Sequence, residues 1–148
     1  MAPSFRVAEP SDADTLVEMM RDFNAHERIA FDESEVRAVL AQLFANDSYG
    51  LTCLMLLHGG VAGYVVITFG FSVEFRGRDA LIDELFVKDE FRGGGLGAAA
   101  IRFAERLCRE RRGRALHLEV ERRNTGAQSV YRRAGFVDHD RYLLTKWL

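Results

Sequence analysis

The spacing of apolar residues in the first third of the chain changes from that of a strand to that of a helix. Residues 5–9 alternate between apolar and polar side chains, which predicts a short strand. Ser11 is expected to cap a helix over residues 11–24, where apolar residues recur at helical spacing. Asp32-x-x-Glu35 resembles a capping box and predicts a second helix over 32–45.

Two long apolar runs, residues 51–57 and 61–71, dominate the middle of the chain. His58-Gly59-Gly60 between them is typical of a tight turn, so the two runs are predicted to form a hairpin. Residues 72–79 are polar and are expected to form a loop. Residues 80–87 predict a further strand, which leads into a segment rich in glycine.

The rest of the chain alternates between helical and strand-like patterns. The expected elements are a loop over 88–97, a helix from about Leu96 to Arg111 that Gly113 stops, a strand over 115–120, a short helix over 127–134, and closing strands over 136–137 and 142–147. With the elements before them, they predict one α/β domain over residues 1–148.

The composition is that of a globular protein, with 48% hydrophobic and 28% charged residues. Because no apolar run suits a membrane-spanning helix and no signal peptide is evident, we expect a cytoplasmic protein with no membrane partner. Cys53 and Cys108 have no partners at metal-ligand spacing. They are expected to be small buried side chains, and no metal is expected.

The net charge of −2 conceals an asymmetry, because residues 1–84 carry −8 and residues 85–148 carry +6. This division suggests a polyanionic ligand for the second part and a cationic ligand for the first. Solvated helix faces of mixed sign are an equally simple explanation. The slightly acidic balance argues against nucleic acid as a partner.

The clearest candidate site is the loop Arg92-Gly93-Gly94-Gly95-Leu96-Gly97 at the start of a predicted helix. Glycines allow a ligand to approach the backbone, and N–H groups at a helix N-terminus can converge on an anion. Arg92 adds a positive charge at the entrance, and Ala98 keeps the first helical turn slim. A purely structural turn is the alternative.

Two other phosphate-binding motifs fit this loop less well. A P-loop needs Lys and then Ser or Thr after the last glycine, where this chain has Ala98-Ala99. Gly93-x-Gly95-x-x-Ala98 matches a dinucleotide fingerprint, with Glu119 or Glu121 about twenty residues further on. However, residues 88–92 separate the strand from the glycines, whereas that fold turns directly into the first glycine.

Three segments resemble the GNAT superfamily of N-acetyltransferases. Arg92-x-x-Gly95-x-Gly97 is similar to the family's pyrophosphate-binding pattern, and Glu84-Leu85-Phe86-Val87 is similar to the strand before it. Asn124-x-x-Ala127-x-x-x-Tyr131-x-x-x-Gly135-Phe136 resembles the family's second characteristic segment. Since the predicted elements also follow the family's order, the resemblance covers essentially the whole chain.

The resemblance implies a mixed, mostly antiparallel sheet, splayed as a V and flanked by helices, with acetyl-CoA between the fourth and fifth strands. The backbone of one strand would pair with the pantetheine arm, the glycine loop would hold the pyrophosphate, and Asn124 would hydrogen-bond near the pantetheine. The implied cofactor-binding residues are Phe86, Val87, Arg92, Gly93, Gly94, Gly95, Leu96, Gly97, Ala98, Asn124 and Tyr131. A homodimer is a further expectation from the family.

Acetyl transfer to an amine needs a base for the attacking ammonium and an acid for the departing thiolate. The resemblance directs Tyr131 toward the sulfur, where its phenol could protonate the thiolate; a core tyrosine is the alternative. Asp83 and Glu84 are the candidate bases, although neighbours on a strand face opposite ways unless a bulge intervenes. The alternative for this pair is one exposed carboxylate and one paired with an arginine.

Leu-Phe-Val after the two carboxylates, and Tyr-Arg-Arg at 131–133, look like the diamine acetyltransferase branch of the family. In that comparison Asp83 falls at the position of the proposed base. The expected function is therefore N-acetyltransfer from acetyl-CoA to a primary amine, by direct attack in a ternary complex. A small cationic molecule is the expected acceptor, with His26 and Glu27 lining its cleft beside Asp83 and Glu84.

Two other functions also fit the sequence. One is acetylation of a protein, on a lysine or on an N-terminal amine. The other is a binding module that holds acetyl-CoA without catalysis.

Overall fold

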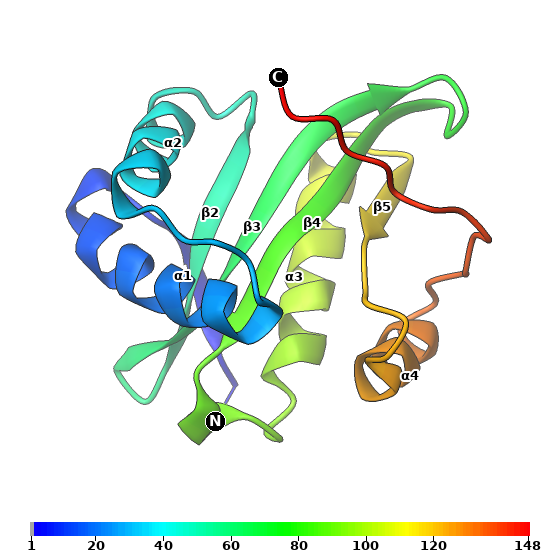
Figure 1. Ribbon diagram of the computed structural model, residues 1–148. Coiled ribbons are helices and arrows are strands. Elements are labelled where there is room, and N and C mark those ends of the chain that lie inside the picture. Colours follow the sequence, from blue (N-terminus) through cyan, green and yellow to red (C-terminus); the bar gives the residue numbers. More distant parts are fainter. Residues whose placement is uncertain (1) are drawn as a thin grey trace.

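The computed structural model describes residues 2–148 and is built on a five-stranded sheet in the order β1-β2-β3-β4-β5 (Figure 1). The strands are β1 (Ser4–Val7), β2 (Gly50–Leu57), β3 (Gly60–Ser72), β4 (Gly77–Val87) and β5 (Ala115–Leu118). The first three pairings are antiparallel, and β4 pairs with β5 in parallel. The mixed, mostly antiparallel sheet that the family resemblance implies is confirmed.

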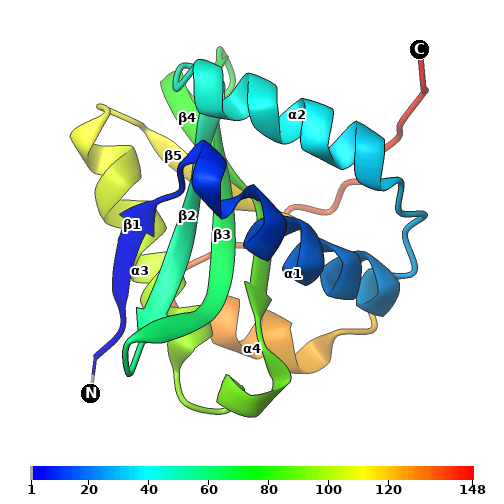
Figure 2. The same ribbon diagram turned by 90° about the vertical axis from the view of Figure 1, so that its left-hand side faces the viewer.

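Four α-helices flank this sheet. They are α1 (Ala13–Glu27), α2 (Glu33–Ala45), α3 (Leu96–Glu110) and α4 (Thr125–Arg133), with short 3-10 turns η1 (Pro10–Asp12) and η2 (Asp89–Phe91). Viewed along the sheet, α1 and α2 lie on one face and α3 on the other (Figure 2). No helix in the described part of the chain has both the length and the apolar character needed to cross a bilayer.

The alternation of side chains along β3 builds a core on each face of the sheet. Tyr64 and Val66 pack beneath α1 and α2, whereas Val65 and Ile67 pack beneath α3. This follows from the two-residue period of a strand, and it explains why β3 is apolar along most of its length. The two cysteines are free and buried, as predicted.

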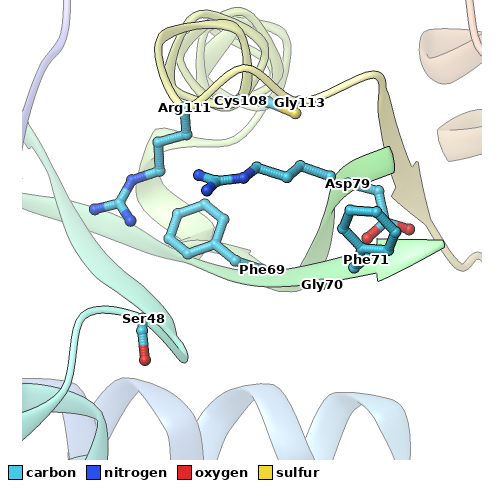
Figure 3. A pocket seen from close by; sticks show the side chains of 9 residues that line it. Ser48, Phe69, Gly70, Phe71, Asp79, Cys108, Arg111 and Gly113 are labelled. Atoms are coloured by element: carbon cyan, nitrogen blue, oxygen red, sulfur yellow. The ribbon is translucent and has the colours of Figure 1, made fainter. Parts of the chain in front are cut away.

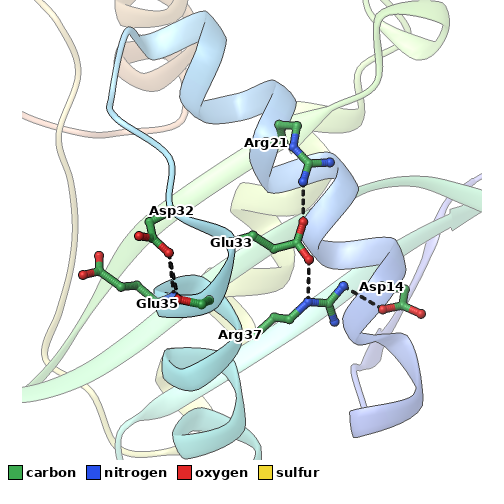
Figure 4. A network of polar contacts seen from close by, with 7 residues as sticks. Asp14, Arg21, Asp32, Glu33, Glu35 and Arg37 are labelled. Atoms are coloured by element: carbon green, nitrogen blue, oxygen red, sulfur yellow. Dashed lines mark hydrogen bonds and ion pairs between the residues drawn. The ribbon is translucent and has the colours of Figure 1, made fainter.

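Charged side chains link α1 to α2 on the outer surface (Figure 4). Glu33 accepts hydrogen bonds from Arg21 and from Arg37, and Arg37 also contacts Asp14. At the start of α2, Asp32 accepts a hydrogen bond of 3.1 Å from the Glu35 N–H, which is the N-cap half of the predicted capping box. The charged contacts bridge the two helices at the surface, where solvent limits their contribution to stability.

The prediction that Ser11 caps the first helix is wrong. The chain enters α1 through η1, and Asp12 is the residue at the α1 N-cap position. The Asp12 carboxylate accepts the Glu9 N–H at 2.8 Å and pairs with Arg6, which lowers the Asp12 pKa to about 2. Because proline sets φ for a first helical turn, Pro10 starts that turn one residue before Ser11.

The polar loop expected over residues 72–79 is also shorter than predicted. Ladder pairing continues to Ser72 and Gly77, which leaves only a turn over residues 73–76. Backbone hydrogen bonds do not need apolar side chains, so a strand end that projects into solvent can be polar. The turn at His58 and Gly59, both with positive φ, is the tight hairpin connection that was expected.

The two closing strands predicted over 136–137 and 142–147 are absent. The chain after α4 forms neither helix nor strand. This segment is tied to the β3–β4 turn by side chains: Arg141 donates to Glu74 at 2.9 Å, and His139 packs on Phe75. β5 is only four residues long and offers little edge for pairing. Apolar side chains in this segment are consequently exposed, among them Tyr142, Leu144 and Trp147.

Candidate active site

The sheet opens between β4 and β5. The parallel pairing joins residues 79–82 to residues 115–118 and ends there, while β4 continues to Val87 (Figure 1). From Asp83 onward, the side of β4 that faces away from β3 has no strand partner in the described chain. A ligand with amide groups can therefore pair with this length of backbone as a strand would.

The glycine loop lies beyond the end of β4 and forms the N-terminus of α3. Gly93 and Gly95 both have φ of 81°, and Gly95 is the N-cap of the helix. A Cβ atom added at Gly93, Gly95 or Gly97 would meet no atom within 4 Å. The backbone here borders open space, which suits the close approach of an anion to the first N–H groups of α3.

The side chains of Leu96, in the glycine loop, and Phe86, in β4, are both buried. Leu96 is 4% exposed and packs in a small cluster with Met55, Ala62 and Ala100, which anchors the start of α3. Phe86 is 7% exposed and packs beneath α1. Only the backbones of these two residues are therefore available to a ligand.

Arg92 lies against the end of β4. Its Nε donates to the Val87 carbonyl at 3.1 Å, and its guanidinium is 3.2 Å from the Asp89 carboxylate. The guanidinium carbon is also 5.9 Å from the centre of the Phe86 ring. Arg92 and Val87, which are both expected to bind the cofactor, are thus joined by a hydrogen bond.

A β-bulge occurs where the sheet opens. Val66 of β3 pairs with Glu84, but the next residue, Ile67, pairs with Ile82, so Asp83 has no partner. Such a bulge rotates the residues around it and re-aims their side chains. The regular alternation, which would place Asp83 and Glu84 on opposite faces, is interrupted at this point.

Both carboxylates lie near Tyr64 of β3. The Tyr64 hydroxyl donates to Glu84 Oε1 at 2.7 Å. Burial, followed by the charges of Glu84 and Asp83, holds the Tyr64 pKa far above its usual range. The negative charge of Asp83 also raises the Glu84 pKa, and we refer to these two neighbouring side chains as the carboxylate cluster.

The surroundings of the two carboxylates favour their protonated forms. Desolvation raises the pKa of Asp83, although its side chain remains accessible to solvent. Desolvation also raises the Glu84 pKa, and the charge of Asp83 adds to this, while the hydrogen bond from Tyr64 opposes it. A carboxylate with a raised pKa is better matched to accept a proton from an amine at neutral pH.

Tyr131 on α4 and Glu27 at the end of α1 are brought toward each other. Tyr131 is half-buried and meets Phe136 edge-on, with 6.1 Å between ring centres. Burial raises the pKa of Tyr131, and the negative charge of Glu27 raises it further. His26, by contrast, is exposed.

Asn124 is the N-cap of α4, and its side-chain oxygen accepts the Ala127 N–H at 3.1 Å. Its amide nitrogen can still donate to a ligand. Tyr64 is the residue of this region that the sequence analysis did not select. The only signal for it is a phenol within the apolar run of β3, whose hydroxyl needs a partner when buried.

A separate cavity of about 480 Å³ lies at the opposite end of α3 (Figure 3). Phe69 lies on its floor, and the Arg111 guanidinium stacks over that ring at 4.2 Å. Asp79, which also lines it, contacts His117 at 3.1 Å. None of the residues predicted to bind cofactor or acceptor lines this cavity. Within residues 2–148, no three His, Cys, Asp or Glu side chains are grouped to hold a metal.

Comparison with known proteins identifies the family. The model of the acetyltransferase (GNAT) family matches residues 16–136. The chain belongs to the GNAT family of acetyl-CoA-dependent N-acetyltransferases. Its relatives include a candidate [ribosomal protein bS18]-alanine N-acetyltransferase of Bacillus subtilis, 42% identical over 57 residues. That alignment spans 38% of this chain and 38% of the length of the curated relative.

Solved structures share the whole fold. An integron cassette protein from a salt-marsh mobile metagenome is 32% identical, with a TM-score of 0.85 over 97% of this chain and 90% of its own. A predicted acetyltransferase of Clostridium acetobutylicum, solved with acetyl-CoA, is 18% identical. Its TM-score is 0.81 over 98% of this chain and 96% of its own. The GNAT-type sheet and its flanking helices are thus common to these proteins.

Proposed function

We propose that this protein transfers the acetyl group of acetyl-CoA directly to the primary amine of a small cationic acceptor. The observation that carries the proposal is the carboxylate cluster at the point where β4 and β5 separate. Asp83 and Glu84 lie there, at the bulge, beside an unpaired strand edge that leads to the open glycine loop. Anionic side chains attract an ammonium to this point, and a basic carboxylate can then remove its proton.

In this proposal the phosphates of acetyl-CoA bind the N–H groups at the start of α3, and its pantetheine follows the free edge of β4. The Phe86 and Val87 backbones and the Asn124 amide would hold the pantetheine. Arg92, which contacts the Val87 carbonyl, would turn toward the phosphates when they bind. Support comes from the open space around Gly93, Gly95 and Gly97 and from the relative solved with acetyl-CoA.

Tyr131 would act as the acid for the departing sulfur. Since burial and the charge of Glu27 raise the pKa of Tyr131, its phenol stays protonated at neutral pH and can donate a proton. Glu27, together with Asp83 and Glu84, would make the acceptor cleft anionic. His26, which precedes Glu27 on α1, is exposed and would line the same cleft.

A second candidate acceptor is the N-terminal amine of a protein. The Bacillus subtilis relative, whose name specifies an alanine of a ribosomal protein, favours this possibility. A small amine and a protein N-terminus would react through the same chemistry at the nitrogen. They differ in size, because the protein amine is followed by a polypeptide.

The test is release of free thiol from acetyl-CoA with a panel of amines: polyamines, amino-acid-derived amines, and peptides beginning with alanine. Mass spectrometry of the products identifies the acetylated nitrogen. Turnover with a small amine and none with the peptides supports the first proposal, and the reverse supports the second. Tight acetyl-CoA binding without thiol release with any amine would indicate a binding module.

We also propose that the chain forms a homodimer through its C-terminal residues. Support comes from Tyr142, Leu144 and Trp147, whose apolar side chains are 82%, 91% and 90% exposed. Contiguous exposed apolar surface marks interaction sites, and these three side chains lie on one stretch of chain, residues 142–147. Light scattering should give twice the chain mass for the parent and the chain mass for a Leu144→Ser, Trp147→Ser variant.

A further inference from the structure

Tyr64 lies at the centre of the sheet and directs one polar atom at the carboxylate cluster. Its side chain is fully buried, and its ring packs between Phe23 and Phe86, with ring centres 6.4 and 5.9 Å away. The hydroxyl donates to Glu84 Oε1 at 2.7 Å, a short hydrogen bond to a charged group. A tyrosine enclosed in this way has little freedom to move its hydroxyl.

The register of β3 and β4 determines this contact. Tyr64 pairs with Phe86, and Val66 pairs with Glu84, so Tyr64 and Glu84 are diagonal neighbours across the two strands. The bulge lies at Asp83, the residue before Glu84 on β4, which has no pairing partner on β3. The contact is thus located at the point where the strand is re-aimed toward the gap between β4 and β5.

The hydrogen bond makes the two carboxylates unequal. Oε1 of Glu84 is engaged by Tyr64, and Oε2 remains free to accept a proton. Asp83 accepts no side-chain hydrogen bond from residues 2–148 and is exposed. One member of the pair is therefore fixed in place by a buried donor, and the other is not.

We propose that Tyr64 is a positioning residue of the acceptor site, whose hydroxyl orients the Glu84 carboxylate as the proton acceptor for the incoming ammonium. The assignment rests on the proposed acetyltransferase function. Tyr64 keeps its own proton throughout, because burial and the two nearby negative charges hold its pKa far above its usual range. It can therefore donate to Glu84 throughout the neutral pH range.

The protons balance in this scheme. The ammonium loses one proton to Glu84 before the nitrogen attacks. It loses a second as the amide N–C bond forms and the thioester C–S bond breaks, and the departing thiolate takes up one proton. Glu84 then returns its proton to solvent, so that one proton is released for each amide formed.

The variant Tyr64→Phe tests the assignment because it removes one hydroxyl and keeps the packed ring. Loss of a hydrogen bond to a charged group should lower kcat/KM for the amine by roughly tenfold to a hundredfold. Without the donor the Glu84 pKa rises, so the acidic limb of the kcat/KM profile should move to higher pH. The KM for acetyl-CoA should not change. Tyr49→Phe, a tyrosine 56% exposed in the loop before β2, is the matched control and should leave the profile unchanged.

A double-mutant comparison separates a role through Glu84 from a merely structural one. If Tyr64 acts through Glu84, adding Tyr64→Phe to Glu84→Gln should cause no further loss of kcat/KM. A loss in that background equal to the loss in the parent would overturn the proposal. An unchanged acidic limb in Tyr64→Phe would also overturn it.

Carbon-13 NMR of the Glu84 carboxyl gives a measurement that needs no acceptor, and the apparent pKa should be higher in Tyr64→Phe than in the parent. If it is higher but no amine is acetylated by the parent, the proposed function fails. The contact is then structural, and the positioning role is overturned with it. If amines are acetylated but Glu84 titrates identically in both proteins, the function stands and only the role of Tyr64 is refuted.

Discussion

Glu27, the last residue of α1, lies close enough to Tyr131 on α4 for its negative charge to raise the pKa of the Tyr131 phenol. The two residues are more than one hundred positions apart in the chain and lie on different helices. Burial acts in the same direction on Tyr131 and is the larger cause. Together they keep the phenol protonated, which an acid for a departing thiolate requires.

The first prediction concerns this phenol. Tyr131→Phe should keep the fold, because the edge-on contact with Phe136 needs only the ring. Affinity for acetyl-CoA should remain near that of the parent, while kcat falls by roughly 10²–10⁴-fold, as is typical when a general acid is lost. Calorimetry and steady-state kinetics measure the two quantities separately. Tyr49→Phe again serves as the control, and parental turnover of Tyr131→Phe at every pH would remove Tyr131 from the mechanism.

The second prediction concerns the glycine loop. A valine at position 97 should be tolerated by the fold, since a Cβ there meets no atom within 4 Å and φ is not positive. Its side chain would occupy the space in which a phosphate approaches the N-terminus of α3. We expect acetyl-CoA affinity to fall at least tenfold, about 1.4 kcal/mol, by calorimetry.

A suitable control for Gly97→Val is Gly60→Val. Position 60 also has room for a side chain, because the nearest atom to an added Cβ is 4.0 Å away, but it lies in the β2–β3 hairpin. Undiminished affinity in Gly97→Val, or an equal loss in both variants, would contradict a phosphate site at this loop.

Most helices and strands up to β5 could be predicted from the sequence because the spacing of their apolar residues is a local property. The pattern at Ile101, Ala104 and Cys108 predicts the buried face of α3, and these three side chains are buried beneath it. The glycine loop could be located for a similar reason. Gly95 takes a backbone conformation that few other residues adopt.

Features that depend on pairing between distant residues could not be predicted in this way. The bulge at Asp83 exists only because Val66 and Ile67 of β3 skip one residue of β4, and no pattern within β4 specifies that register. The role of Tyr64 depends on the same register. The strands expected over 136–137 and 142–147 have suitable side chains, but a strand also needs a partner edge.

The third prediction concerns the stability of the fold. Desolvation raises the Asp83 pKa, so the folded chain holds this proton more tightly than the unfolded chain. The penalty for ionising Asp83 builds up as pH rises from the ordinary aspartate pKa, which applies to the unfolded chain, to the raised pKa of the folded chain, and it is complete above that. Asp83→Asn removes the penalty and should be more stable than the parent at pH 7.

The size of this effect is limited because the Asp83 side chain is accessible and solvent screens its charge. We expect at most about 1 kcal/mol, or ~2–4 °C in Tm. The difference in stability between Asp83→Asn and the parent should vanish near pH 3. This pH is below the ordinary aspartate pKa of about 3.9, so Asp83 is mostly protonated in both the folded and the unfolded chain. Thermal unfolding at the two pH values measures it, with Asp140→Asn, an exposed acid, as the control. A less stable Asp83→Asn at pH 7 would mean that Asp83 stabilises the fold through its charge.

The last prediction concerns the charge of the acceptor. Residues 1–84 carry a net charge of −8, and Asp83 and Glu84 stand where that part of the chain meets the cofactor strand. If the pair holds an ammonium and then accepts its proton, Asp83→Asn and Glu84→Gln should raise the acceptor KM and lower kcat. They should also move the pH optimum upward, because a more basic medium must then deprotonate the amine.

Acetyl-CoA should bind these two variants almost as it binds the parent, since its phosphates would lie at the glycine loop and not at the bulge. Salt gives an independent measure of the charge effect. Attraction between the cleft and a cationic acceptor is screened over about 8 Å at physiological ionic strength, so the parent's acceptor KM should rise with salt more steeply than that of either variant. Steady-state kinetics with the best amine of the panel, from about pH 6 to 9, measures the effect of each substitution on the acceptor KM and kcat. This range covers the pH at which a carboxylate with a raised pKa acts as a base. If both variants acetylate that amine at the parental rate throughout, the acidic cluster has no part in binding or activating the acceptor.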